Sequence, residues 1–118
     1  MLISSSFKDF IWTNHSLEKM AFYNLSQQRV KRVLRHPHRT EKGIVEETLA
    51  SMQKAGSKKH PYEVWVMYQF KTEKSKNKKQ KEKKIIIISA WKYPGISKPG
   101  EEIPIPQDIL EEVLKEYL

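Results

Sequence analysis

The sequence predicts an α+β domain in which two N-terminal helices and a C-terminal helix pack on a small antiparallel sheet of 3–4 strands. Three features lead to this prediction. Apolar residues recur at helical spacing near both ends of the chain, and they alternate at strand spacing in the middle. In addition, four consecutive isoleucines follow a lysine-rich segment. Helices at both ends of a run of strands are typical of this fold class.

Two helices are predicted in succession before residue 37. Thr13 or Asn14 caps the first helix, and Ser26 is a favourable N-cap for the second, which ends near Arg35. Pro37 closes the second helix because the residue before a proline is pushed out of helical conformation. Each helix has an apolar side that is expected to face the core, formed by Leu17, Met20, Ala21, Val30, Val33 and Leu34.

The isoleucine run at residues 85–88 is the clearest strand signal. Four consecutive β-branched residues leave no polar face, so both faces of this strand are expected to be buried at the centre of a sheet. Pro94 and Gly95 mark its end. Residues 62–70 alternate between two faces and predict the preceding strand. The two strands are expected to form an antiparallel hairpin, with residues 71–84 as a flexible lysine-rich loop.

The segments on either side of this hairpin are predicted less directly. Gly43 indicates a turn between two short strands within residues 39–53, and a helix over residues 45–54 is the alternative. After the hairpin, prolines and glycines break the chain up to Pro106, which fits the first turn of the C-terminal helix. The apolar face of that helix consists of Ile109, Leu110, Val113, Leu114 and Tyr117.

The charge of the chain is unevenly distributed. A single domain is expected over the 118 residues, and the net charge of the chain is +8. Residues 71–84 hold eight lysines and two glutamates, so this segment alone carries +6 and the remainder +2. Within that remainder, residues 15–39 hold six basic residues and one acid, whereas residues 101–118 hold six acids and one lysine. The basic part of this pattern predicts a surface for nucleic acid or an acidic partner, and a solvated surface is the alternative.

Several functional classes are excluded by composition. The chain contains no cysteine, which removes disulfides and thiolate chemistry. Residues 1–12 show neither the basic start nor the apolar core of a signal peptide, and no apolar stretch is long enough to span a bilayer. We therefore expect a cytoplasmic protein that does not insert into membranes.

A set of short motifs resembles a known family. His15 opens the first helix with Lys19-Met20 behind it, Leu25-Ser26 begins the second, and a Val-x-x-Val-Leu helix leads to His36-Pro37. The last strand ends in Ala-Trp-Lys-Tyr-Pro-Gly at residues 90–95. Over residues 12–100 this layout resembles a family of small bacterial proteins of unknown function that are related to the RelE and BrnT toxins. The family has arginine at the position of Lys19, and often a second arginine at the position of Tyr23.

The resemblance implies a RelE/BrnT-like fold and a class of activity. Members of the wider group cleave RNA without a metal, often on the ribosome, and are restrained by an antitoxin protein. Many relatives lack a demonstrated activity, and a shared fold does not by itself confer the chemistry. For this chain the resemblance implies RNA or the ribosome as a binding partner, together with an acidic antitoxin-type protein.

Metal-independent RNA cleavage needs a base for the 2′-hydroxyl, cations for the phosphorane and an acid for the leaving oxygen. His15 is the candidate proton carrier, and Lys92 and Tyr93 are a candidate cation and proton donor at the tip of the isoleucine strand. The structural alternatives are that His15 only packs or forms hydrogen bonds in its helix, and that Lys92 and Tyr93 have no shared site.

The second predicted helix is basic on its outer face. Its arginines suit bidentate contacts with phosphate, and an aromatic at the strand tip could stack on a base. The alternatives are a solvated helix face and a core position for Trp91. The candidate nucleic-acid-binding residues are Lys19, Arg29, Arg32, Arg35, Arg39 and Trp91.

No metal or cofactor is expected. His36 and His38 flank a proline, and no carboxylate or cysteine nearby completes a set of ligands. Three functional hypotheses therefore follow. They are a RelE/BrnT-like metal-independent endoribonuclease, a noncatalytic RNA- or ribosome-binding module, and a protein-interaction domain in which the basic second helix and the acidic last helix bind each other or partner chains.

Overall fold

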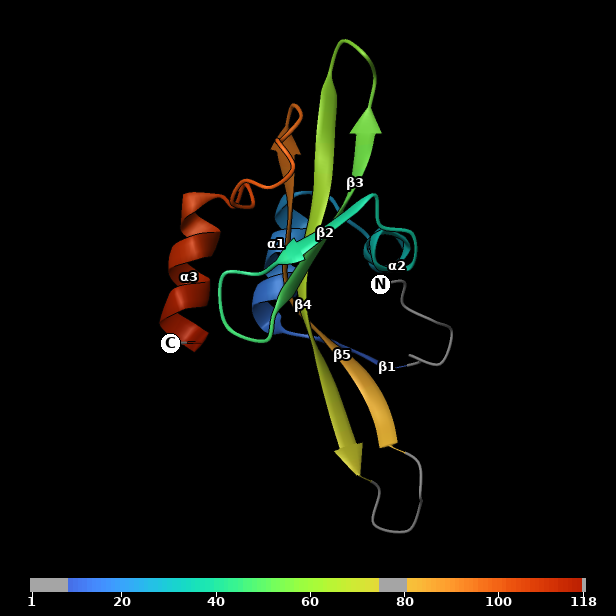
Figure 1. Ribbon diagram of the computed structural model, residues 1–118, viewed down its shortest axis with the longest axis vertical. Helices are drawn as coiled ribbons and strands as arrows, with labels where there is room; N and C mark the ends of the chain where they lie inside the picture. Colours follow the sequence, from blue (N-terminus) through green and yellow to red (C-terminus); the bar gives the residue numbers. More distant parts are fainter. Residues whose placement is uncertain (1–8, 75–80, 118) are drawn as a thin grey trace.

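The computed structural model describes residues 9–74 and 81–117, which form a five-stranded mixed sheet with helices on both of its faces (Figure 1). The predicted α+β class is confirmed. In chain order the elements are β1 (Asp9–Trp12), α1 (Asn14–Phe22), α2 (Gln27–Arg35), β2 (Arg39–Lys42), β3 (Leu49–Gly56), β4 (Pro61–Lys74), β5 (Lys81–Pro94) and α3 (Gln107–Tyr117).

The sheet is larger than predicted and is not purely antiparallel. Its strand order is β1-β5-β4-β3-β2, and β1 pairs with β5 in parallel orientation while the other pairs are antiparallel. The sequence prediction missed β1, which has only four residues and leads directly into a helix cap. Thr13 continues this connection, since its hydroxyl donates a hydrogen bond of 2.8 Å to the Ile87 carbonyl oxygen. The isoleucine strand is therefore internal, as predicted.

The predicted hairpin between the two long strands is confirmed, and its strands extend further than expected. The backbone ladder of β4 and β5 continues from the Lys71–Lys84 pair to the Lys74–Lys81 pair. The ends of the predicted loop are therefore strand. The rest of that loop, residues 75–80, lies outside the described residues.

The two short strands predicted around Gly43 are also found, as β2 and β3, and no helix forms over residues 45–54. Gly43 is needed at this turn because a Cβ atom there would overlap the Thr48 hydroxyl. Thr48 in turn donates a hydrogen bond of 2.6 Å from its Oγ1 to the Val45 carbonyl oxygen. The glycine therefore allows the chain to reverse between β2 and β3.

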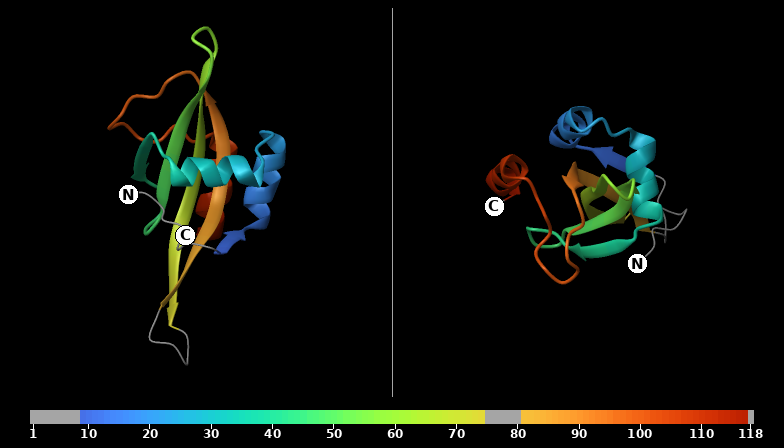
Figure 2. Two further views of the ribbon diagram at one scale, coloured as in Figure 1. Left: turned by 90° about the vertical axis from the view of Figure 1, so that its right-hand side faces the viewer. Right: turned by 90° about the horizontal axis from the view of Figure 1, so that it is seen from above.

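Both N-terminal helices begin at the predicted caps. The Thr13 side chain accepts a hydrogen bond from the Ser16 amide, and the Ser26 side chain accepts one from the Arg29 amide. Asn24 follows α1 with a φ of 55°, a left-handed conformation that asparagine tolerates better than most residues. This residue turns the chain sharply, so α2 crosses the sheet at a large angle to α1 (Figure 2).

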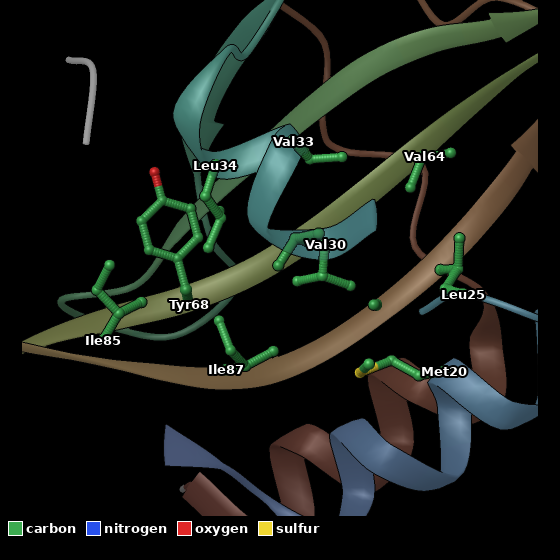
Figure 3. Packing of buried hydrophobic residues seen from close by; sticks show 11 residues of the cluster. Met20, Leu25, Val30, Val33, Leu34, Val64, Tyr68, Ile85 and Ile87 are labelled. Atoms are coloured by element: carbon green, nitrogen blue, oxygen red, sulfur yellow. The ribbon is translucent and has the colours of Figure 1, made fainter. Parts of the chain in front are cut away.

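The helices form separate layers on the two faces of the sheet (Figure 2). The first core lies beneath α1 and α2, where Val30, Val33 and Leu34 of α2 are fully buried against β4 and β5 (Figure 3). The second core lies under α3, whose Ile109 and Val113 pack on Trp65 and other residues of the opposite face. The basic α2 and the acidic α3 are thus separated by the sheet and do not bind each other within the chain.

A β-bulge in β5 controls which side chains reach the α3 face. Met67 pairs with Ser89 and Tyr68 pairs with Ile87, so Ile88 has no partner residue in β4. An extra residue of this kind re-aims the side chains that follow it. Ile87 and Ala90 belong to the first core, whereas Ile88 and Trp91 belong to the second.

Candidate nucleic-acid interface

A cleft of about 400 Å³ lies where the end of α1 and the start of α2 meet β4 and β5. Three of its lining residues are cations: Arg29 and Arg32 from α2, and Lys92 from β5. We call this hollow the basic cleft. Its complete lining is Met20, Ala21, Asn24, Leu25, Ser26, Arg29, Arg32, Tyr62, Val64 and Lys92.

No carboxylate lines the basic cleft. Within residues 9–74 and 81–117, neither Arg32 nor Lys92 forms an ion pair with an acidic side chain. Burial lowers the pKa of the Arg29 guanidinium from its ordinary value, and the charge of Arg32 lowers the pKa further. Two guanidinium groups of like charge therefore face the same cleft, and an anion bound between them would offset their repulsion.

Arg29 is held at the cleft by Gln53 of β3. The Arg29 guanidinium donates a hydrogen bond of 2.5 Å to Gln53 Oε1. The amide nitrogen of Gln53 donates to the carbonyl oxygens of Arg32 and His36, at 3.2 and 2.7 Å. Gln53 therefore satisfies carbonyls at the end of α2 and fixes an arginine with the same side chain. Gln53 was not among the site residues predicted from the sequence.

Tyr62 forms part of the cleft wall between the cations. Lys92 Nζ lies 5.4 Å from the centre of the Tyr62 ring, within the range of a cation–π contact. Tyr62 is also close enough to Arg29 to influence its pKa. Tyr62 was predicted to lie in a strand and was not among the predicted site residues. The alternation of residues 62–70 puts it on the same face as Val64, and Val64 pairs with Lys92, so the signal was present.

The remaining predicted basic residues lie outside the basic cleft. Lys19 Nζ lies 2.8 Å from Asp108 Oδ2 and 3.4 Å from Glu112 Oε1, so it joins α1 to α3. Arg35 is exposed on α2 but does not line the cleft. Arg39 points to another site, where its guanidinium donates to Ser97 Oγ at 3.0 Å.

His15 is also remote from the basic cleft. It lies in the first turn of α1, whereas the cleft is lined by the end of that helix, six residues or about 9 Å further along the axis. His15 Nδ1 lies 2.7 Å from Glu112 Oε2, and Nε2 lies 3.0 Å from Ser89 Oγ. A carboxylate only accepts hydrogen bonds, so Nδ1 carries a proton. This side chain joins α1, β5 and α3.

The order Ser89–His15–Glu112 has the spacing of a serine hydrolase triad. However, Ser89 is fully buried in the sheet, so a substrate has no path to its hydroxyl oxygen. The half-buried cation Lys19 also binds the same carboxylate that faces His15. The arrangement is therefore structural: it satisfies three polar side chains where two helices meet the edge of β5.

Tyr93 and Trp91 face away from the basic cleft. Successive side chains of a strand point to opposite faces, so Lys92 enters the cleft while its two neighbours face α3. Trp91 is fully buried, stacks on Trp65 with ring centroids 6.2 Å apart, and donates its indole N–H to the Pro104 carbonyl at 3.0 Å. The core interpretation of Trp91 agrees with this position. A base cannot stack on a ring that has no exposed surface.

A buried hydrogen-bond network around Glu63 was not predicted from the sequence. Glu63 of β4 is fully buried, and its carboxylate accepts hydrogen bonds from the Trp65 indole at 3.0 Å, the Ser97 amide at 3.1 Å and the Ser97 hydroxyl at 2.6 Å. Arg39 completes the network by lying 5.0 Å over the Trp65 ring. The network fastens the connection between β5 and α3 to the sheet.

The described residues contain no group of three or more histidine, aspartate or glutamate side chains placed to hold a metal ion. In the same residues, no helix is both long and apolar enough to cross a membrane. Comparison of the chain with protein-family models, curated proteins and solved structures gave no match. The chemistry of the basic cleft is therefore the basis on which a function can be assigned.

Proposed function

We propose that this protein binds RNA, free or in the ribosome, through the basic cleft, and that it does so without cleaving the RNA. One observation carries the proposal: Arg29, Arg32 and Lys92 converge on one hollow that no carboxylate lines. Arginine presents a planar set of donors that matches phosphate, and lysine adds a point charge. An RNA phosphate would relieve the repulsion between these cations.

The neutral residues of the cleft favour a nucleic acid over a simple anion. Asn24 and Ser26 offer polar groups beside the cations, and Tyr62 offers an aromatic ring. Contacts with phosphate and sugar commonly combine arginine and lysine with such polar side chains. Aromatic faces add contacts to bases that are not paired. A nucleotide therefore uses more of this lining than phosphate alone.

The resemblance to the RelE/BrnT-like group supports the same proposal. The motif residues that carry the resemblance include the second helix, which supplies Arg29 and Arg32 to the cleft. An antitoxin-type partner of this group would place an acidic segment over the same cations and compete with RNA. We therefore include an acidic protein partner in the proposal.

RNA cleavage is the second candidate, because Lys92 and Tyr62 bring a cation and a phenol to the cleft. The lining contains neither a histidine nor a carboxylate to serve as a general base. His15 and Tyr93, the predicted catalytic residues, lie away from the cleft. Binding without cleavage is therefore the function that the geometry supports best.

One experiment separates these candidates. The purified protein is incubated in EDTA with labelled RNA, alone and with ribosomes, and binding is followed over a series of salt concentrations. We expect binding that weakens steeply with salt and no cleavage products. Cleavage in EDTA would show that the protein is a metal-independent nuclease and that the proposal of binding without cleavage is wrong. Binding that is insensitive to salt would rule out the basic cleft as an electrostatic site.

A further inference from the structure

Phe22, at the end of α1, is the most exposed large apolar side chain among the described residues, with 76% of its surface open to solvent. Single exposed apolar residues are common and need no explanation by themselves. The position of Phe22 is what distinguishes it. Ala21 precedes it and Asn24 follows two residues later, and both line the basic cleft. Phe22 does not itself line the cleft, but its exposed ring belongs to a residue that lies between two lining residues in the chain.

Tyr23 contacts one side of the Phe22 ring and so helps to fix its orientation. The Phe22 ring meets the ring of Tyr23 edge-on, with the centroids 4.8 Å apart. Tyr23 is itself half-buried and packs against both cores of the protein. The Tyr23 ring is thus anchored, and it restrains Phe22 while leaving most of the Phe22 surface exposed. A preorganised ring loses little freedom when a flat ligand stacks on it.

We propose that Phe22 is a stacking platform for a base of single-stranded RNA. This inference rests on the proposed function: a phosphate in the basic cleft places the adjacent nucleotide at the corner between α1 and α2. Stacking on an aromatic side chain requires an exposed base face, which a single strand offers and the interior of a duplex does not. The size of the cleft agrees with the binding of a single nucleotide, since 400 Å³ lies near the small end of the range for small-ligand sites.

The platform predicts a defined substrate preference. A single strand gains both the phosphate contacts and the base stacking, whereas a duplex gains the phosphate contacts alone. The preference is expected to be tolerant of sequence, because every base has a π-face. Leu17 is a matched control, since it is an apolar residue on the same helix with 41% of its surface exposed and does not line the cleft.

The test uses fluorescence anisotropy with the full chain and a labelled RNA oligonucleotide, single-stranded or annealed to its complement. Phe22→Ala is expected to weaken single-strand binding roughly tenfold, Phe22→Trp to retain it, and Leu17→Ala to leave it unchanged. Duplex binding should be weaker and insensitive to Phe22→Ala. The fold of each variant is checked by its thermal unfolding midpoint.

Three results would overturn parts of this account separately. If Phe22→Ala matches the wild type while Arg32→Ala loses affinity, the platform is wrong and the basic cleft stands. If neither variant changes RNA affinity, the proposed function itself fails. If Phe22→Ala weakens the binding of a polyglutamate peptide but not the binding of RNA, Phe22 belongs to a protein interface and the platform is again wrong.

Discussion

His15 Nδ1 lies 2.7 Å from Glu112 Oε2, so the first turn of α1 is bonded to the middle of α3. The sequence predicted a catalytic role for this histidine, which opens the first helix. Its two ring nitrogens are instead occupied by Glu112 and the buried Ser89. This geometry makes His15 a connection between elements that are far apart in the sequence.

Replacing His15 should therefore affect stability and leave RNA binding intact. His15→Ala removes two hydrogen bonds and leaves the Ser89 hydroxyl unpaired, which should lower the free energy of unfolding by about 1–3 kcal/mol. Urea denaturation measures this change, and RNA affinity is measured on the same sample. His60→Ala, at an exposed loop position, is the control and should change neither quantity. A loss of RNA affinity in folded His15→Ala would return this residue to the binding site.

The ion pair between Lys19 and Asp108 predicts a dependence of stability on pH. The hydrogen bond from Lys19 holds the pKa of Asp108 below its ordinary value of 3.8. A lowered pKa in the folded state means that the stabilisation is complete above pH 3.8 and is lost as the pH falls through the folded-state pKa. The same hydrogen bond raises the pKa of Lys19 above its ordinary value of 10.5. The stabilisation from Lys19 is therefore complete below pH 10.5 and is lost as the pH rises through the raised, folded-state pKa.

The size of this effect is limited because more than half of the Asp108 side chain is exposed. The contribution should be less than about 1 kcal/mol and should shrink in high salt. Asp108→Asn is expected to flatten the acid limb of the stability curve below pH 3.8. Thermal unfolding midpoints of both proteins, recorded from neutral to acid pH, test this. Parallel acid limbs in the two proteins would show that the ion pair makes no contribution.

Ser26 caps α2, the helix that carries two cations of the basic cleft. Its hydroxyl accepts a hydrogen bond of 3.0 Å from the Arg29 amide. Ser26→Ala should lower the free energy of unfolding by about 1 kcal/mol, whereas Ser26→Asn should retain the cap. Chemical denaturation of the three proteins gives the comparison. Equal losses in both variants would mean that capping is not the source of the stabilisation.

Glu63 is the most costly polar residue to remove among those described above. Glu63→Ala leaves the Trp65 indole and the Ser97 amide and hydroxyl without their acceptor. We expect a loss of about 3 kcal/mol or more, with a lower thermal midpoint. Glu102→Ala, which changes an exposed carboxylate, should be neutral. If both variants unfold at the wild-type midpoint, the network does not hold the β5–α3 connection.

Local signals made most of the fold predictable. The caps at Thr13 and Ser26, the apolar stripe of α2 and the buried isoleucine strand depend on neighbouring residues, and each is found as expected. The parallel strand β1 depends on pairing with residues more than seventy positions away, which no local pattern encodes. The predicted sheet therefore had too few strands, because its most distant pairing, between β1 and β5, was not predicted.

The candidate site likewise has features that local sequence predicts and features that depend on the folded chain. Arg29 and Arg32 share a face of one helix because they are three residues apart, so the sequence places them together. Their convergence with Lys92 depends on the angle between α2 and the sheet and on the β4–β5 register. Tyr93 could have been separated from Lys92 by strand alternation alone. The buried network of Glu63 and Ser97 needs the folded connection and has no signal in the sequence.

The most direct test of the central claim compares Arg32→Ala with Arg35→Ala for affinity to single-stranded RNA. Both variants remove an arginine from α2, but only Arg32 lines the basic cleft. Arg32→Ala should weaken binding roughly tenfold and reduce the salt slope by about 0.7, the value for one lost phosphate contact with a single strand. Arg35→Ala should change both quantities much less. Equal losses in the two variants would contradict a cleft and leave only a diffuse positive charge on the helix.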